Sequence, residues 1–103
     1  MSALLDFAIF PTDKGDSVSQ YVSKVIEMIR ESGVDYQLTA MGTLIETETF
    51  SEGLDIVNKA YAILEPHSDR VYCTMTADIQ SNKNNRLSSK VNAIESKIGK
   101  VNH

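Results

Sequence analysis

The spacing of apolar residues changes several times along this 103-residue chain, and the order of these changes limits the fold more than any other feature. Apolar and polar residues alternate, as in half-buried β-strands, in three segments: 4–10, 36–47 and 70–79. Apolar residues recur every three or four positions, as in helices, in three others: 18–29, 50–64 and 87–98. Gly42 divides the segment 36–47, so we interpret it as two strands joined as a hairpin.

The predicted order is therefore β-α-β-β-α-β followed by a C-terminal helix. Two helices and four antiparallel strands in this order predict an α+β, ferredoxin-like sandwich with both helices on one face of the sheet. The other face is left without helices. The chain length fits one domain over residues 1–103.

Local signals define the helix ends. Residues 17–20 and 49–52 have the spacing of a capping box, in which a hydroxyl and a carboxyl or amide side chain satisfy the first N–H groups of a helix. Gly33 is suited to close the first helix, and Pro66 ends the second. The third helix has a narrow apolar stripe, so we expect it to lie against a sheet edge or a neighbouring subunit.

The period of two assigns Leu5, Phe7 and Ile9 to the core and their neighbours to the helix-free face. The register across Gly42 stays open, because a shift of one residue would exchange the faces of Leu44 and Ile45. We expect the helix-free face to carry Leu4, Asp6, Ala8, Phe10, Gln37, Thr39, Met41, Tyr72, Thr74, Thr76 and Asp78, with Thr43, Ile45 and Thr47 or their neighbours.

This face mixes hydroxyls, aromatic rings, a methionine and isolated carboxylates, which favours subunit packing that leaves polar pockets. Ordinary explanations also exist, because threonine is a good strand former and aromatic residues often only pack. Asp6 and Asp78 are disfavoured in mid-strand, which indicates an inter-subunit hydrogen bond or a cationic ligand. Glu46 is open between a ligand role and pairing with a nearby lysine.

Charge and cysteine content restrict the class of protein. Residues 1–80 carry five Lys and Arg against thirteen Asp and Glu, so the body of the chain should repel nucleic acid. Residues 81–103 carry five against one, which we interpret as a solvated helix face. We expect no membrane segment, and the single Cys73 without a secretory-type leader indicates a cytoplasmic setting.

No residues suggest catalysis, a metal or a cofactor. His67 and His103 have no partner nearby in sequence for a dyad or a ligand set, and there is no glycine-rich phosphate loop. Cys73 falls on the core-facing phase of its strand, so we expect it to be a small buried side chain rather than a nucleophile. The sequence therefore favours a binding protein over an enzyme.

The run SGVDYQLTAMGTLIE, residues 32–46, together with FAIFP at residues 7–11, resembles the small thiamine-binding protein family related to YkoF. The resemblance covers nearly the whole chain. It departs from the family pattern at Ala8, where serine is common, and after Asp78, where an acid and an arginine commonly follow.

The resemblance implies a ferredoxin-like homodimer or homotetramer that binds thiamine or its hydroxymethylpyrimidine portion without a reaction. A flat ring would suit hydroxyls, aromatic rings and sulfur, and a thiazolium cation would suit carboxylates. The candidate ligand-binding residues are Asp6, Phe10, Thr39, Met41, Gly42, Thr43, Glu46, Tyr72, Thr74 and Asp78. The alternatives are a regulatory or structural oligomerisation module without this ligand and, more remotely, a thiamine-salvage enzyme.

Overall fold

The computed structural model describes all residues 1–103 and contains one sheet of four strands in the order β2-β3-β1-β4. All neighbouring strands are antiparallel, which confirms the predicted ferredoxin-like arrangement. The strands are β1 (Ser2–Pro11), β2 (Asp35–Leu38), β3 (Thr43–Thr47) and β4 (Val71–Gln80). The central strands β1 and β3 thus lie between two edge strands.

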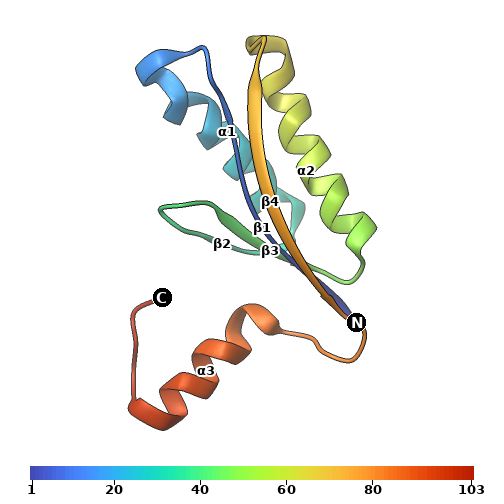
Figure 1. Ribbon diagram of the computed structural model, residues 1–103, viewed down its shortest axis with the longest axis vertical. Coiled ribbons are helices and arrows are strands. Elements are labelled where there is room, and N and C mark those ends of the chain that lie inside the picture. Colours follow the sequence, from blue (N-terminus) through green and yellow to red (C-terminus); the bar gives the residue numbers. More distant parts are fainter.

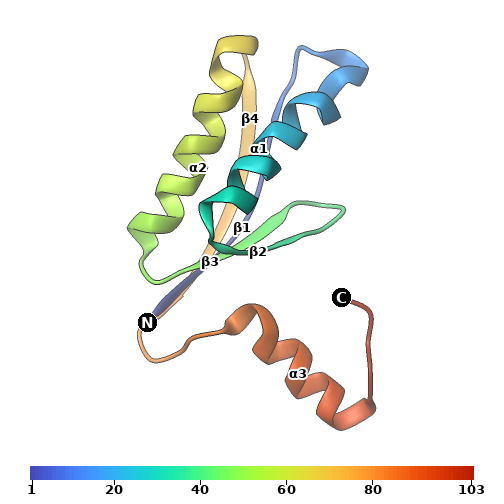
Figure 2. The ribbon, with the colours of Figure 1, turned by 180° about the vertical axis from the view of Figure 1, so that it is seen from behind.

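Two helices cover one face of this sheet. They are α1 (Val18–Ser32) and α2 (Phe50–Leu64), and they pack beside each other on the same side of β1 (Figures 1 and 2). Short 3₁₀ turns, Gly15–Ser17 and Glu65–His67, precede α1 and follow α2. The third helix, α3 (Arg86–Ile98), lies apart from this pair at the end of the sheet where the chain begins.

The helix ends follow the predicted signals only in part. Thr49 caps α2, because its hydroxyl accepts a hydrogen bond from the N–H of Glu52 at 3.1 Å. Gly33 ends α1 in the left-handed conformation with φ 81°. The predicted cap by Ser17 is wrong: this residue belongs to the preceding 3₁₀ turn, and its side chain makes no capping hydrogen bond.

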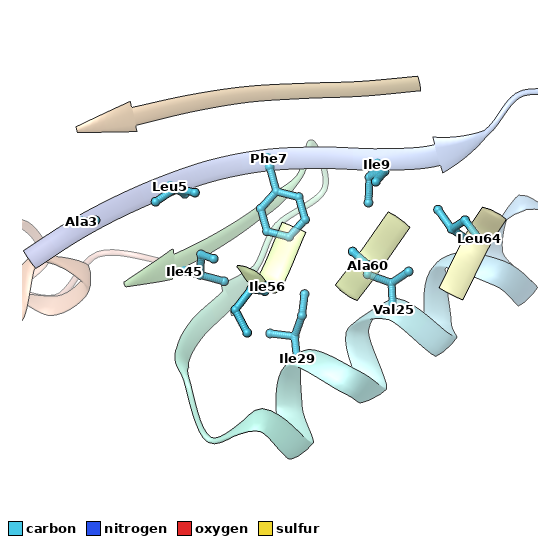
Figure 3. Packing of buried hydrophobic residues seen from close by; sticks show 10 residues of the cluster. All are labelled: Ala3, Leu5, Phe7, Ile9, Val25, Ile29, Ile45, Ile56, Ala60 and Leu64. Carbon is cyan, nitrogen blue, oxygen red and sulfur yellow. The ribbon is translucent and has the colours of Figure 1, made fainter. Parts of the chain in front are cut away.

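The hydrophobic core lies between β1 and the two helices (Figure 3). Leu5, Phe7 and Ile9 point towards the helices, as their alternation predicted. They meet α1 and α2 side chains that are also buried, namely Val25, Ile29, Ile56, Ala60 and Leu64. Each fully buried aliphatic side chain contributes about 1.5–3 kcal/mol, so this cluster holds the two layers together.

The register of β3 resolves the position left open by the sequence. Leu5 lies opposite Ile45 and Phe7 lies opposite Thr43, so Thr43, Ile45 and Thr47 all face the helices. Of the two alternatives that the sequence left open, the one that places these three residues on the helix-free face is therefore excluded. Side chains alternate between the two faces of a strand, so the neighbours Leu44 and Glu46 point to the helix-free face.

β2 is shorter than predicted. It ends at Leu38, and residues 39–42 form a four-residue turn rather than a continuation of the strand. The expected strand positions of Thr39 and Met41 are therefore wrong. Met41 lies at the tip of this turn, where it is 90% exposed and pairs with no strand.

Cys73 is exposed, contrary to the expectation of a buried thiol. Its side chain has the predicted core-facing phase, since it lies opposite Ile9, but β4 is an edge strand and the helices do not reach over this part of it. Met75 on the same side is also exposed. Partial burial nevertheless raises the pKa of the Cys73 thiol.

α3 gives the molecule an extended shape. The radius of gyration is 14.9 Å, compared with about 13 Å for a compact domain of this length. α3 contacts the central strands β1 and β3 as well as the edge strand β2, so within the chain it does not lie against one sheet edge alone, and it has no buried residue. Ile94 and Ile98 on its apolar stripe are 39% and 74% exposed.

Candidate functional site

A cleft of about 320 Å³ opens between α1, the second half of β1 and the turn that joins β2 to β3. It is lined by 14 residues, of which 11 are hydrophobic. They come from three segments, residues 7–10, residues 38–43 and four positions of α1: Val18, Val22, Val25 and Ile26. A concave, mainly apolar site with a few polar groups is typical of small-molecule binding.

The β2–β3 turn that walls the cleft is held by Thr39. The Thr39 hydroxyl donates to the carbonyl oxygen of Gly42 at 2.8 Å and accepts from the N–H groups of Met41 and Gly42 at 3.3 and 3.1 Å. In Figure 2 this turn projects to the same side of the molecule as the beginning of α1. Thr39 therefore shapes the cleft, and its own hydroxyl is already satisfied.

Thr43 provides a free hydroxyl inside the cleft. The residue is only 5% exposed, lines the cleft and makes no side-chain hydrogen bond within the chain. No fully buried side-chain polar atom lacks a partner, so this hydroxyl keeps access to the cleft space. It is thus available to a ligand, although from the helix-covered side of the sheet.

Asp6 lies beside the cleft on the helix-free face. A Cβ atom on Gly42 would be 2.9 Å from the Phe7 carbonyl oxygen and 3.1 Å from Asp6 Oδ1. Only a glycine allows the turn to approach β1 so closely. The exposed Asp6 carboxylate therefore stands next to a residue that lines the cleft.

Phe10 connects the cleft with the helix-free face. It lines the cleft and its ring lies 5.7 Å from the ring of Tyr72, at an interplanar angle of 38°. Thr74 is exposed on the same face, opposite Ala8. These residues extend the site from the cleft towards β4.

Glu46 has a different environment, because its carboxylate caps α3. It accepts hydrogen bonds from the N–H groups of Arg86 at 3.0 Å and Leu87 at 3.1 Å. Desolvation raises the pKa of Glu46, but these donors outweigh it and hold the pKa below its ordinary value of 4.5. Pairing with a lysine, one of the two alternatives left open for Glu46, is therefore excluded, and its oxygens are already engaged away from the cleft.

Asp78 is also engaged at this end of the sheet. Arg86 Nη1 lies 3.1 Å from Asp78 Oδ2, and Arg86 further donates to the hydroxyl and carbonyl oxygens of Ser2 at 2.9 and 2.8 Å. Arg86 thus joins the start of β1, the end of β4 and α3. An arginine does follow Asp78, eight positions later in the chain rather than directly after it.

A comparison with protein families identifies the chain. A family model described as "Thiamine-binding protein" matches residues 5–95. The chain belongs to this family. Its sequence relatives include UPF0045 proteins of Methanothermobacter thermautotrophicus, 36% identical over 80% of this chain and 84% of the relative, and of Mycobacterium bovis, 30% identical over 92% and 93%.

Solved structures of other proteins share the fold of this chain. A hypothetical protein from Methanocaldococcus jannaschii has a TM-score of 0.79 and 31% identity, with coverage of 90% of this chain and 95% of that one. A protein from Thermotoga maritima, described as a thiamine biosynthesis/salvage protein, has a TM-score of 0.78 at 20% identity and covers 91% and 99%. The second likeness shows the fold alone.

The structure separates the candidate residues of this family member into three groups. Five line the cleft: Phe10, Thr39, Met41, Gly42 and Thr43. Three lie on the helix-free face near it: Asp6, Tyr72 and Thr74. Glu46 and Asp78 lie at the far end and bind α3.

Sequence reasoning did not identify the apolar walls of the cleft. Val18, Val22 and Ile26 were assigned only to the core stripe of α1, yet they line this open space. Their spacing of four residues was the available signal. No helix of the chain combines the length and apolar character needed to cross a membrane, and no three acidic, His or Cys side chains gather as a metal site.

Proposed function

We propose that this protein binds thiamine, or its hydroxymethylpyrimidine portion, without catalysing a reaction. The carrying observation is that five candidate residues line one apolar cleft that is bordered by a carboxylate. The cleft accommodates the flat aminopyrimidine, and Asp6 stabilises the thiazolium cation at its mouth. Family membership supports the choice of ligand.

The proposal includes a second copy of the chain on the helix-free face. This face exposes Tyr72 and Thr74 and partly exposes Leu4 and Leu44, a mixture that subunit packing would cover. A homodimer or homotetramer would shelter the cation beside Asp6 from water. The unpaired Cys73 favours a reducing compartment, so we place this assembly in the cytoplasm.

An oligomerisation module without a small ligand is the second candidate. The observation that favours it is the unpartnered apolar stripe of α3, which ends in the exposed Ile98. In that case the helix-free face would only pack against its copy. Thiamine would then give no binding heat, although the protein would still assemble.

Calorimetric titration of the protein with thiamine and with hydroxymethylpyrimidine tests the proposal. We expect both to bind, and we expect Asp6→Asn to weaken thiamine by about 5-fold, equivalent to about 1 kcal/mol, because one carboxylate–cation attraction is lost. Hydroxymethylpyrimidine carries no cation, so its affinity should not change. Asp55→Asn, an exposed acid on α2, is the matched control. No binding at millimolar ligand would overturn the proposal.

A further inference from the structure

One residue of β1 that lines the cleft, Ile9, directs its main-chain N–H and C=O to a side where no strand pairs with them. Pro11 lies opposite Val71, so Thr12 lies opposite Arg70, and the N–H of Thr12 donates to the carbonyl oxygen of Arg70 at 3.0 Å. In an antiparallel pair, every second residue of a strand directs its N–H and C=O towards the same neighbouring strand. Thr12, Phe10 and Ala8 therefore direct these groups towards β4. The peptide groups of Phe7 and Ile9 must therefore point the other way, towards β3.

β3 reaches only one of these two residues. Its register ends where Phe7 lies opposite Thr43, and continuation would place Met41 opposite Ile9. The N–H of Met41 instead donates to the Thr39 hydroxyl, and none of the turn's hydrogen bonds reaches Ile9. The N–H and C=O of Ile9 are consequently left without a partner strand.

This unpaired edge lies in surroundings that require a partner. Ile9 is only 6% exposed and lines the apolar cleft. Buried peptide groups in proteins are almost always hydrogen-bonded. The free hydroxyl of Thr43 lines the same cleft, so three polar groups are available within an otherwise apolar wall.

We propose that the N–H and C=O of Ile9, together with the Thr43 hydroxyl, are the recognition edge for a flat heteroaromatic ring with a donor and an acceptor on adjacent atoms. The amino group of an aminopyrimidine donates to the Ile9 carbonyl, and the neighbouring ring nitrogen accepts from the Ile9 N–H. The ring thus replaces the missing strand residue. This inference rests on the proposed function and specifies that the cleft recognises the aminopyrimidine ring of thiamine.

The walls of the cleft suit such a ring. Val22 and Ile26 of α1 and Leu38 of β2 offer apolar contact. Met41, which is 90% exposed at the tip of the turn, supplies a thioether that makes favourable contacts with aromatic rings. The polar edge gives the orientation, and the apolar walls give the contact area.

Oxythiamine tests the inference, because it replaces the amino group by a carbonyl oxygen and turns the adjacent ring nitrogen into a donor. The carbonyl oxygen of oxythiamine would then lie against the Ile9 carbonyl oxygen, and its ring N–H would lie against the Ile9 N–H. We expect thiamine to bind at least about 100-fold more tightly than oxythiamine in calorimetric titration, since mismatched buried groups are strongly rejected. Equal affinities would overturn the inference alone. No binding of either compound would overturn the proposed function as well.

Two matched threonine variants test the hydroxyl. Thr43→Val should reduce thiamine affinity about 10-fold, because it removes a free hydroxyl from the cleft wall. Thr47→Val, on the same strand and face, should not change affinity, since Thr47 donates to the carbonyl oxygen of Thr49 at 2.7 Å outside the cleft. Unchanged thiamine affinity in Thr43→Val would refute the role of this hydroxyl.

Amide hydrogen exchange followed by NMR tests the main-chain groups without a substitution. The Ile9 amide should exchange faster than the Phe7 amide in the free protein, because only Phe7 is paired with β3. Saturating thiamine should slow Ile9 exchange at least about 10-fold and leave Phe7 unchanged. Bound thiamine with unaltered Ile9 exchange would overturn the inference.

Discussion

The hydroxyl of Thr39 donates to the carbonyl oxygen of Gly42 at 2.8 Å across the turn between β2 and β3. The same hydroxyl accepts from the N–H of Gly42, so the Thr39 side chain binds both the N–H and the C=O of Gly42. The turn consequently leaves the β1 ladder after Thr43. The cleft exists because a local side-chain contact replaces a strand contact.

Thr39→Val should weaken both the turn and ligand binding. The substitution removes three hydrogen bonds of the turn, and we expect a loss of about 1–2 kcal/mol in the free energy of unfolding, measured by urea denaturation. Thiamine affinity, measured by calorimetry, should fall by at least 10-fold because the cleft wall moves. Thr12→Val, which also loses a side-chain to main-chain hydrogen bond, is the control and should retain affinity. Full affinity in Thr39→Val would contradict this role of the turn.

Gly42→Ala should destabilise the protein by contact rather than by backbone strain. The new Cβ would lie 2.9 Å from the carbonyl oxygen of Phe7, so the turn must shift away from β1. We expect a loss of about 1–3 kcal/mol in the free energy of unfolding and weaker thiamine binding. Gly33→Ala, strained at φ 81° but remote from the cleft, should lose stability and keep its affinity. Equal affinity in both variants would argue against a site at Gly42.

Glu46→Gln should loosen α3. A neutral amide cannot replace a carboxylate that accepts from two helix N–H groups, so we expect a loss of about 1–2 kcal/mol, seen as faster amide exchange in α3. Glu48→Gln, at an exposed position on the same segment, is the control. The two variants should bind thiamine equally, because neither residue lines the cleft.

The same contact predicts a pH dependence. The folded pKa of Glu46 is lowered, so its stabilisation is present above its ordinary pKa of 4.5 and is lost as the pH falls through the lower folded value. The protection of the α3 amides, which is their exchange rate relative to the intrinsic rate at each pH, should therefore fall in the wild type as the pH drops below 4.5. This acid-induced change should be smaller in Glu46→Gln. An identical pH profile in both proteins would contradict the capping role.

Light scattering should show that the purified protein is not a monomer. Thr74→Arg places a charge on the helix-free face without touching the core, since Thr74 is exposed, and we expect it to shift the mass towards that of a monomer. Asn58→Arg on the outer side of α2 is the matched control and should keep the wild-type mass. A monomeric wild type would contradict subunit packing on this face.

Sequence periodicity predicted the layers well, because the burial of Leu5, Phe7 and Ile9 follows directly from the alternation of apolar residues. It failed for Cys73, since alternation gives the face of a side chain but not whether a helix covers it. It also failed for Met41, whose apolar character indicated a strand while the hydroxyl of Thr39 bent the chain into a turn.

The candidate site was predictable only where its residues are close in sequence. Thr39, Gly42 and Thr43 belong to one motif and do meet in the cleft. Glu46 belongs to the same motif, but its contact partners lie 40 and 41 residues later in α3. The free edge at Ile9 follows from strand register, which no local pattern specified.

A ¹⁵N–¹H correlation spectrum recorded during titration with thiamine tests ligand binding in the cleft most directly. We expect saturable shifts of the amides of Ile9, Gly42 and Thr43, with little change in the amides of α2. The absence of shifts at millimolar thiamine, or shifts confined to residues outside the cleft, would contradict thiamine binding at this site.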